Sequence, residues 1–221
     1  MTQIYKTKGI VLAKKPWREA DLLFSIFTED FGKIKVISAG VRKIKSKLSG
    51  QINTPGIVEI LFASGRNFKK LTHACLDERF VVAAEPDFYF YAAVLELLDK
   101  SSPEDEKNRK IFALAVFTLK KIISENKLTV KKFWLNFFII KLLSFCGYEL
   151  KTIEQAGEKN NQRLVQVIRR ISAGDCQNLR LRKDENQQLF CLLKNQVQFY
   201  LEREICGLNI LQDIDIKHNV N

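Results

Sequence analysis

Hydrophobic residues alternate with polar ones through the first 80 positions of the chain. Leu22, Phe24 and Ile26 are separated by single residues, and the run KIKVI at 33–37 alternates lysines with aliphatic side chains. A period of two is typical of half-buried β-strands. Turn-forming runs, EDFGK, NTPG and SGRN, separate these segments. The pattern predicts five strands, at about 4–14, 20–28, 33–39, 56–63 and 69–77.

Five short strands in so little chain favour a closed barrel, because closure removes the unpaired edges of a small sheet. We therefore predict an OB-type barrel over residues 1–82.

From Pro86 onward the apolar spacing becomes helical. The segment 133–146 is apolar nearly all round, which indicates a helix at the centre of a bundle. We predict a helical domain over residues 83–221, and hence a mixed α+β chain of two domains. The expected helices cover 85–100, 102–125, 129–147, about 161–172 and about 185–206.

Helix start and stop signals set these bounds. Ser102 is predicted to cap the second helix, with Glu104, Asp105 and Glu106 facing its positive end. Asp184, with Gln187 three positions later, is predicted to cap the last helix. The glycines that follow helical patterns are interpreted as C-terminal stops: Gly147, Gly174 and Gly207.

Positive charge is concentrated at the N-terminal end of the chain. The formal net charge is +11, and residues 1–83 hold 15 Lys and Arg against 7 acids, a net +8. The stretch from Gly32 to Gly50 carries six cations, and no acid occurs between Phe31 and Val58. Such a surface attracts a polyanion, most often nucleic acid; an anionic membrane surface and an ordinary solvated face are the alternatives.

The cations fall into three groups. Two lie on one face of the predicted third strand, several follow in a Gly- and Ser-containing arm from Gly40 to Gly50, and a third group sits between the first two strands beside Trp17. Trp17 is either a stacking surface for a base or a packing residue. The predicted DNA-binding residues are Lys14, Lys15, Arg18, Lys33, Lys35, Arg42, Lys43, Lys45 and Lys47.

Enzyme chemistry finds little support in the sequence. The motifs GxxxxGK[ST], HExxH and GxSxG do not occur, and the two histidines, His73 and His218, lie in a predicted strand and a polar tail. The five cysteines are widely spaced, so buried reduced thiols are expected rather than a zinc site or disulfides. The apolar segment 133–147 contains Asn136 and Lys141 and is too short and polar for a membrane span. No secretory signal is recognised, which makes cytoplasm the expected location.

Several motifs carry a resemblance to a known family. Residues Glu19, Asp21, Leu22 and Leu23 precede Phe31 and Gly32, and then come Gly40, Arg42 and Lys43 with Ser46, Lys47 and Leu48. In this order and spacing the first 75 residues resemble the N-terminal region of the bacterial DNA repair protein family RecO. Behind this region, the helical part matches the family in pattern only.

The resemblance implies an OB-fold and helical protein that binds single- and double-stranded DNA and anneals complementary strands. It also implies that the protein helps RecA to replace single-strand-binding protein on DNA and that it does so together with RecR. RecF is a further candidate partner. Many members carry a four-cysteine zinc module. Here Cys146, Cys176, Cys191 and Cys206 form no CxxC pair, so no metal or other cofactor is expected.

The helical domain carries a hypothetical second site, for binding a protein partner. A basic rim around aromatic residues would suit the acidic, aromatic-ended tail of single-strand-binding protein. The alternative is that the lysines compensate a helix C-terminus and the rings pack in the core. The residues concerned are Lys120, Lys121, Lys131, Lys132, Phe133 and Trp134.

The functional hypothesis is therefore a recombination mediator that acts electrostatically and makes or breaks no bonds. An RNA-binding OB-fold protein of the translation machinery would show the same basic barrel. A nuclease would need a metal-dependent acidic cluster.

Overall fold

The computed structural model describes residues 3–41, 47–65, 68–148, 162, 165–168 and 182–219. The chain divides into two compact units. One comprises Met1–Val82 with Leu97–Ala113, and the other comprises Ala83–Glu96 with Leu114–Asn221. The sequence pattern placed a single boundary near residue 83, whereas the first unit also includes Leu97–Ala113.

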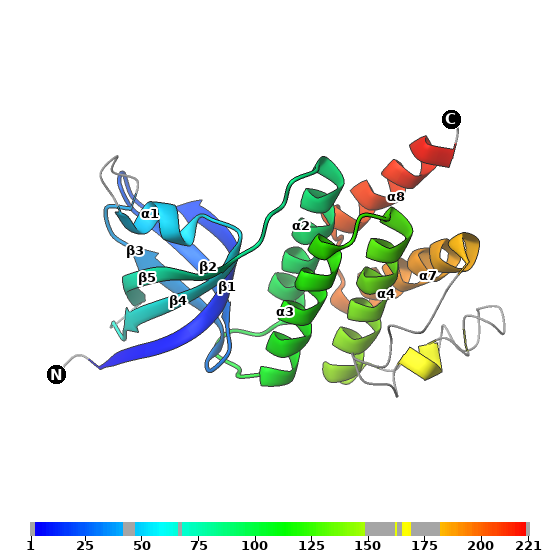
Figure 1. Ribbon diagram of the computed structural model, residues 1–221. Coiled ribbons are helices and arrows are strands. Elements are labelled where there is room, and N and C mark those ends of the chain that lie inside the picture. The colour runs from blue at the N-terminus through cyan, green and yellow to red at the C-terminus, as the bar shows by residue number, and fades with distance from the viewer. Residues whose placement is uncertain are drawn as a thin grey trace. The chain divides into compact units, whose positions relative to one another are not determined.

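Five strands form a closed barrel in the order β1-β2-β3-β5-β4 (Figure 1). Neighbouring strands are antiparallel except β3 and β5, which are parallel. The strand bounds are Ile4–Pro16 for β1, Leu22–Thr28 for β2, Gly32–Ser38 for β3, Gly56–Ala63 for β4 and Lys69–Arg79 for β5. The predicted OB-type barrel is confirmed, and each strand lies within two residues of its predicted bounds.

The barrel interior is filled by one face of each strand. Side chains of β3 alternate as the sequence indicated: Ile34 and Val36 are fully buried, whereas Lys35 between them is exposed. In β2 both faces are largely buried, because Leu23 and Phe27 are covered as well. Phe24, Ile60 and Phe62 close the same core. Burial of these large apolar side chains is the main force that holds the barrel together.

A short helix interrupts the segment between β3 and β4. Helix α1 spans Lys47–Ile52, and Ile52 is buried in the barrel core. The backbone N–H of Leu76 donates to Oε1 of Gln51 at 2.9 Å, which ties the helix to β5. The expectation of a mobile arm as far as Gly50 is wrong for its last residues, because α1 buries Ile52 against the barrel.

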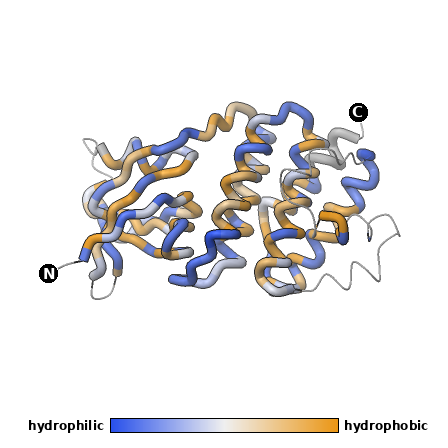
Figure 2. Tube along the Cα trace, turned by 60° about the horizontal axis from the view of Figure 1, so that its bottom comes forward, coloured by the Kyte–Doolittle hydropathy of each residue, from blue (hydrophilic) through white to orange (hydrophobic). Residues whose placement is uncertain are grey.

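The described residues after β5 are mostly helical. Helix α2 spans Glu85–Ser101, α3 Arg109–Ser124, α4 Leu128–Phe145, α7 Lys183–Leu201 and α8 Cys206–Asn219, and residues 165–168 are also helical. Hydrophobic positions recur along these helices as they do along the strands (Figure 2).

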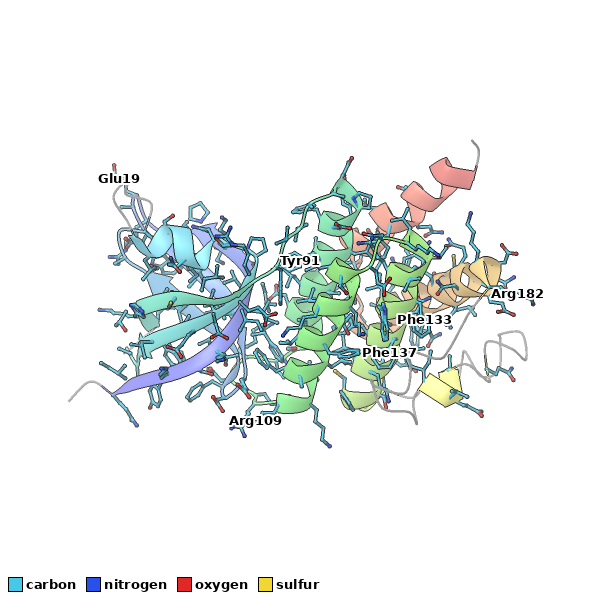
Figure 3. All side chains as sticks on the ribbon, viewed as in Figure 1. Glu19, Tyr91, Arg109, Phe133, Phe137 and Arg182 are labelled. Carbon is cyan, nitrogen blue, oxygen red and sulfur yellow. The ribbon has the colours of Figure 1, made fainter. Side chains whose placement is uncertain are left out.

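Helix α4 is at the centre of the helical unit, as predicted. Twelve of its residues are buried, among them Phe133 and Phe137 (Figure 3). Polar groups fix its register against α7: Nδ2 of Asn136 donates to Oδ1 of Asn186 at 2.8 Å, and Nδ2 of Asn186 donates to the carbonyl of Thr129 at 2.6 Å. Buried amides with partners cost little and favour a single register.

The end of α4 confirms one of the glycine stops. Gly147 has φ +81°, and the backbone N–H of Tyr148 donates to the carbonyl of Leu143 at 2.9 Å. The N–H of Gly147 donates to the carbonyl of Ser144 at 3.2 Å. This pair of hydrogen bonds is a Schellman motif. Gly174 lies outside the described residues.

Gly207 has a different role from the one predicted. Helix α7 ends at Leu201, with Glu202 in the left-handed region at φ 50°. Gly207 lies in the first turn of α8, where a Cβ would come within 2.7 Å of Cα of Ala93 in α2. The Glu96 carboxylate accepts from the backbone N–H groups of Cys206 and Gly207 at 3.0 and 2.8 Å. The glycine therefore permits close helix packing, and α8 takes its N-terminal cap from α2.

Two predicted caps are wrong. Helix α3 begins at Arg109, where Oδ1 of Asn108 accepts from the backbone N–H of Ile111 at 3.1 Å, so Asn108 is the cap rather than Ser102. At α7 the Glu185 carboxylate accepts from the backbone N–H of Arg182 at 3.1 Å, so the pairing lies two residues earlier than Asp184 and Gln187. In both cases several neighbouring polar residues could act as the cap. The sequence alone does not show which of them takes that role.

The cysteines also differ from the expectation of burial. Four lie in the described part of the chain, where none of them forms a disulfide, and Cys75 and Cys206 among them are exposed. Among the described residues, no helix is long and apolar enough to cross a membrane.

Candidate nucleic-acid interface

The first group of predicted cations lies at the end of β1 and in the connection to β2. Lys14, Lys15 and Arg18 are exposed. Nζ of Lys14 donates to Oδ1 of Asn53 at 2.7 Å. Within the described part of the chain, Lys15 and Arg18 have no ion pair. These side chains are available to a phosphate group.

The β1–β2 connection is a compact turn. The backbone N–H of Trp17 donates to the carbonyl of Asp21 at 3.1 Å, and the N–H of Asp21 returns to the carbonyl of Arg18 at 3.4 Å. Oδ1 of Asp21 accepts from the backbone N–H of Gly40 at 2.8 Å, which ties this turn to the end of β3. The side chains that the turn presents are therefore held in place before any ligand binds.

The second group lies on β3 and is already neutralised. Nζ of Lys33 donates to the backbone carbonyl of Asp99 at 2.5 Å and lies 3.7 Å from the Asp99 carboxylate. The Lys33 side chain is only 13% exposed. Lys35 forms an ion pair with Glu104. The structure thus gives both lysines acidic partners that a phosphate would have to displace.

Glu104, the partner of Lys35, belongs to an acidic segment, Glu104–Glu106, that precedes α3. Nζ of Lys69 lies 2.6 Å from Oδ1 of Asp105, and the backbone N–H of Asp105 donates to the carbonyl of Lys33 at 2.8 Å. The prediction that these acids face a helix N-terminus is wrong. They lie against β3 and the start of β5, because α3 begins only at Arg109.

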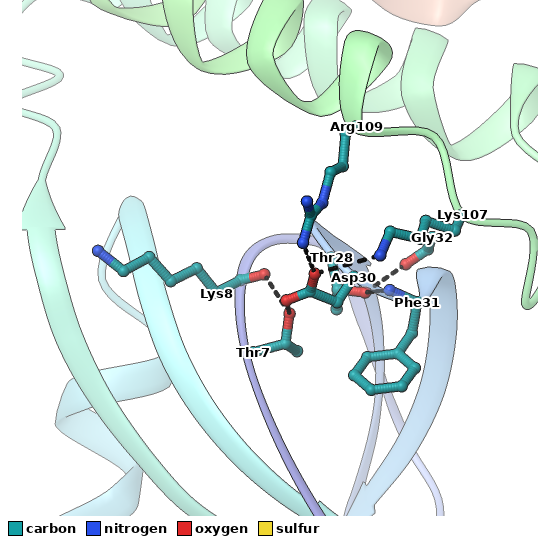
Figure 4. Close-up of polar contacts among 8 residues, drawn as sticks. All are labelled: Thr7, Lys8, Thr28, Asp30, Phe31, Gly32, Lys107 and Arg109. Atoms are coloured by element: carbon teal, nitrogen blue, oxygen red, sulfur yellow. Dashed lines mark hydrogen bonds and ion pairs between the residues drawn. The ribbon is translucent and has the colours of Figure 1, made fainter.

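Asp30, in the β2–β3 turn, anchors the same region (Figure 4). Its carboxylate accepts from Arg109 at 2.5 Å, from Oγ1 of Thr7 at 3.2 Å and from Nζ of Lys107 at 3.4 Å. The hydrogen bond from Arg109, followed by those from Thr7 and Lys107, holds the pKa of Asp30 below its usual range despite some desolvation. Asp30 therefore fastens the residues after the acidic segment to the barrel.

The third group, on the arm, lies largely outside the described residues. This is true of Arg42, Lys43 and Lys45. Lys47 opens helix α1, and the structure does not describe its side chain.

A groove of about 650 Å³ opens between the β1–β2 and β4–β5 connections. Its most prominent feature is an aromatic pair, Trp17 and Phe68, whose ring centroids are 4.7 Å apart at 65°. Each side chain is 37% exposed. The groove is lined by Trp17, Arg18, Asp21, Ile37, Ala39, Gly65, Phe68, Lys70, Leu71 and Thr72.

Sequence reasoning missed Phe68 and Lys70 as candidates. They sit beside a turn signal at 64–67, and no local pattern shows that this turn meets Trp17 across the barrel. Only the strand order, with β5 beside β3, brings Lys70 next to Ile37. The usable signal was a large aromatic residue within a polar connection of a predicted OB barrel, where ligand-binding loops are expected.

A smaller pocket of about 160 Å³ lies between the first and second groups of cations. It is lined by Lys14, Lys15 and Lys35 together with Ser25, Leu23, Ala13 and Asp99. Three lysines from two strands surround it, but Asp99 lines it as well and Lys35 is paired with Glu104. The structure thus joins members of the first two groups that are distant in sequence.

In the helical unit, most of the predicted partner-binding residues are buried. Lys131 and Lys132 are 3% and 7% exposed, and Phe133 and Trp134 are 6% and 4% exposed. Nζ of Lys131 lies 2.5 Å from Oδ1 of Asp87 and donates to the carbonyl of Ile122 at 2.9 Å. Phe133 and Trp134 belong to the core, as the alternative interpretation held, and the burial of Lys131 and Lys132 was predicted by neither interpretation.

The two remaining residues of this set lie closer to the surface. Lys120 is exposed, and Lys121 is half-buried with its Nζ 5.6 Å from the ring centroid of Trp134. This lysine makes a cation–π contact that partly covers the aromatic core.

A closed five-stranded barrel with cations and aromatic rings on its connecting loops, continued by a helical region, defines a protein of the OB-fold class. The family profile described as "Recombination protein O N terminal" matches residues 1–79, and that described as "Recombination protein O C terminal" matches residues 87–170. The chain belongs to the RecO family, as its N-terminal motifs indicated.

Curated relatives carry the same family name. "DNA repair protein RecO" of Chlorobium phaeobacteroides (strain BS1) is 33% identical over 156 residues, which is 68% of this chain and 58% of the relative. The protein of that name from Dehalococcoides mccartyi (strain CBDB1) is 28% identical over 219 residues, 95% of this chain and 84% of the relative. The alignment thus spans under two thirds of the Chlorobium relative. Nothing in these comparisons supports an RNA-binding protein of the translation machinery.

Proposed function

We propose that this chain is a DNA repair and recombination mediator. It binds single- and double-stranded DNA, anneals complementary strands and assists RecA in loading onto DNA covered by single-strand-binding protein. Family membership carries the proposal, since the relatives are named DNA repair proteins. The exposed cations at the end of β1 and the charge of the barrel support it.

The proposed mechanism is electrostatic and needs no cofactor. Two DNA strands repel each other through their phosphates, and a basic surface that neutralises both lowers this barrier. The bases remain free to pair, because phosphate contacts carry no sequence information. Lys14, Lys15 and Arg18 supply the exposed part of this surface, and we propose that Arg42, Lys43, Lys45 and Lys47 also contact phosphates.

Lys33 and Lys35 join this surface conditionally. Their carboxylate partners, Asp99 and Glu104, occupy the positions that phosphates would take. A DNA strand that binds β3 must therefore exchange one ion pair for another. Such an exchange contributes less affinity than a contact with an unpaired lysine.

An annealing assay tests the proposal. Complementary labelled strands are mixed with the protein, with and without single-strand-binding protein, and duplex formation and cleavage are followed with magnesium present. We expect faster annealing and no cleavage. Cleavage would indicate a nuclease, and binding to structured RNA without faster annealing would indicate the translation-machinery alternative; either result would overturn the proposal.

We propose RecR and single-strand-binding protein as partners, and RecF and RecA as further ones. The protein is proposed to act in the cytoplasm and not to bind a membrane. The acidic tail of single-strand-binding protein is proposed to contact the surface at Lys120 and Lys121, the members of the predicted set that are not buried. Replacement of both lysines by glutamate should lower the affinity of the protein for a labelled tail peptide. Lys127→Glu is the control. Equal affinities in all three proteins would exclude this surface.

A further inference from the structure

We propose that Trp17 and Phe68 form a stacking site for an unpaired nucleobase, so that the barrel distinguishes single strands from duplex DNA. This inference rests on the proposed function, because it names the part of DNA that the groove receives.

The two rings form a preformed platform. They come from different connections, β1–β2 and β4–β5, and meet with ring centroids 4.7 Å apart at 65°. The edge of one ring covers part of the other, and each side chain keeps 37% of its surface exposed. The backbone hydrogen bond from Trp17 to Asp21 closes the turn at 17–21 and restrains the backbone that carries the ring, which lowers the entropy lost when a base binds.

Exposure of this pair needs an explanation beyond folding. Among the other large aromatic side chains of the barrel, Phe24, Phe27 and Phe62 are at most 1% exposed, and Tyr5 and Phe31 are partly buried against the core. Apolar surface left in a groove with polar neighbours commonly marks a binding site. The groove volume, about 650 Å³, falls within the range of roughly 300 to 1,000 Å³ of small-ligand sites.

Charge around the rings selects a nucleotide as the occupant. Arg18 and Lys70 line the groove together with the aromatic pair, both are exposed, and neither has an ion pair among the described residues. They can hold the phosphates of a strand whose base lies against the rings. This combination of a cationic groove with aromatic rings is how single-stranded nucleic acid is bound without sequence preference.

The polar groups of the groove favour stacking over base-specific recognition. Oδ1 of Asp21 is occupied by the N–H of Gly40, and Oγ1 of Thr72 donates to the carbonyl of Leu61 at 3.0 Å. The floor is apolar, with Ile37, Ala39 and Leu71. We therefore expect any base to be accepted, provided that it is not already stacked within a duplex.

Abasic DNA provides the decisive experiment, since it keeps the phosphates and removes the bases. The affinities of the full chain for a fluorescein-labelled oligothymidylate and for an abasic strand of equal length are compared by anisotropy. We expect a preference for the base-bearing strand of roughly 5- to 150-fold, the range for base–aromatic stacking. Trp17→Ala and Phe68→Ala should reduce this preference, and Trp17→Phe should retain part of it.

Fluorescence gives an independent measurement. The chain has two tryptophans, and Trp134 is only 4% exposed, so quenching on addition of the oligothymidylate should come from Trp17 and disappear in Trp17→Phe. Phe199→Ala is the matched control, because Phe199 is 72% exposed on α7 in the other compact unit.

Each outcome has a distinct meaning. Equal affinity for abasic and base-bearing strands, or a preference unchanged by Trp17→Ala, would overturn the stacking site and leave DNA binding intact. If both ring variants kept their DNA affinity and lost a protein partner instead, the groove would be a protein-docking surface and the inference would be wrong. Absence of binding to either strand at low salt would contradict the proposed function itself.

Discussion

Single residues fix where the segment before α3 lies against the barrel. Gly32 has φ 65°, and a Cβ at this position would come within 1.9 Å of the carbonyl oxygen of Glu106. No other residue type fits such a close approach of two backbones. The Phe31–Gly32 motif of the family resemblance therefore has a packing reason in this chain.

Gly32→Ala should destabilise the protein. The left-handed backbone alone costs about 1–3 kcal/mol, and displacement of the Glu106 backbone adds to this. Urea unfolding measures the loss of unfolding free energy. Gly50→Ala is the control, because no atom lies within 4 Å of a Cβ there and alanine favours the helix; equal stability of the two variants would contradict this account.

Asp30 should make stability depend on pH. Its folded-state pKa is lowered by Arg109, Thr7 and Lys107 and thus lies below that of the unfolded chain. The stabilisation is therefore fully present above the unfolded-state pKa and is lost as the pH falls through the folded-state pKa. Urea midpoints measured from about pH 7 to about pH 3 should fall more for the wild type than for Asp30→Asn. Parallel curves would show that Asp30 makes no net contribution.

At the scale of elements, strands were predicted more accurately than helix ends. The alternation in β3 predicted its bounds to within one residue, because only one of its faces is well buried. The bounds of β2 were also predicted to within two residues, although both of its faces are largely buried. The start of α3 was misplaced by seven residues, since Ser102 with its following acids and Asn108 are both acceptable caps. Long-range pairing of Glu104 and Asp105 with lysines of β3 and β5 decided between them.

Neutralisation of the acidic segment should strengthen DNA binding. Glu104→Gln with Asp105→Asn removes two negative charges beside Lys35 and Lys69 and frees both lysines for phosphates. We expect about fivefold higher affinity, equivalent to about 1 kcal/mol. Anisotropy titrations with a labelled single strand measure the change.

A charge-matched control separates this local effect from a change in net charge. Glu202→Gln with Asp213→Asn removes two acids from the helical unit instead. If both double variants bind DNA equally well, then the acidic segment does not compete with DNA.

At the scale of the whole molecule, charge is distributed unevenly. The net +8 in the first 83 residues lies on the barrel, whereas the helical unit is dominated by the apolar helix α4. Both lysines on β3 are paired with acids, whereas Lys15 and Arg18 at the β1–β2 connection are exposed and have no ion pair in the described part of the chain.

Reversal of Arg42, Lys43, Lys45 and Lys47 to glutamate should abolish DNA binding at moderate salt. If about six phosphates are neutralised on a single strand, the slope of log affinity against log salt is roughly −4 for the wild type. A fourfold rise in salt should then weaken binding by roughly a few hundredfold. If the variant with all four substitutions kept its DNA affinity and its circular dichroism spectrum, the arm would be excluded from the interface.

The barrel, the central helix and the basic N-terminal part could all be predicted from the sequence. These follow from periodicity and composition, which local chain chemistry sets. Tertiary structure alone decided which cations remain available, because the carboxylates that pair with Lys33 and Lys35 are more than 60 positions away in the chain. It likewise decided that Trp17 meets Phe68, since only closure of the barrel brings those two loops together.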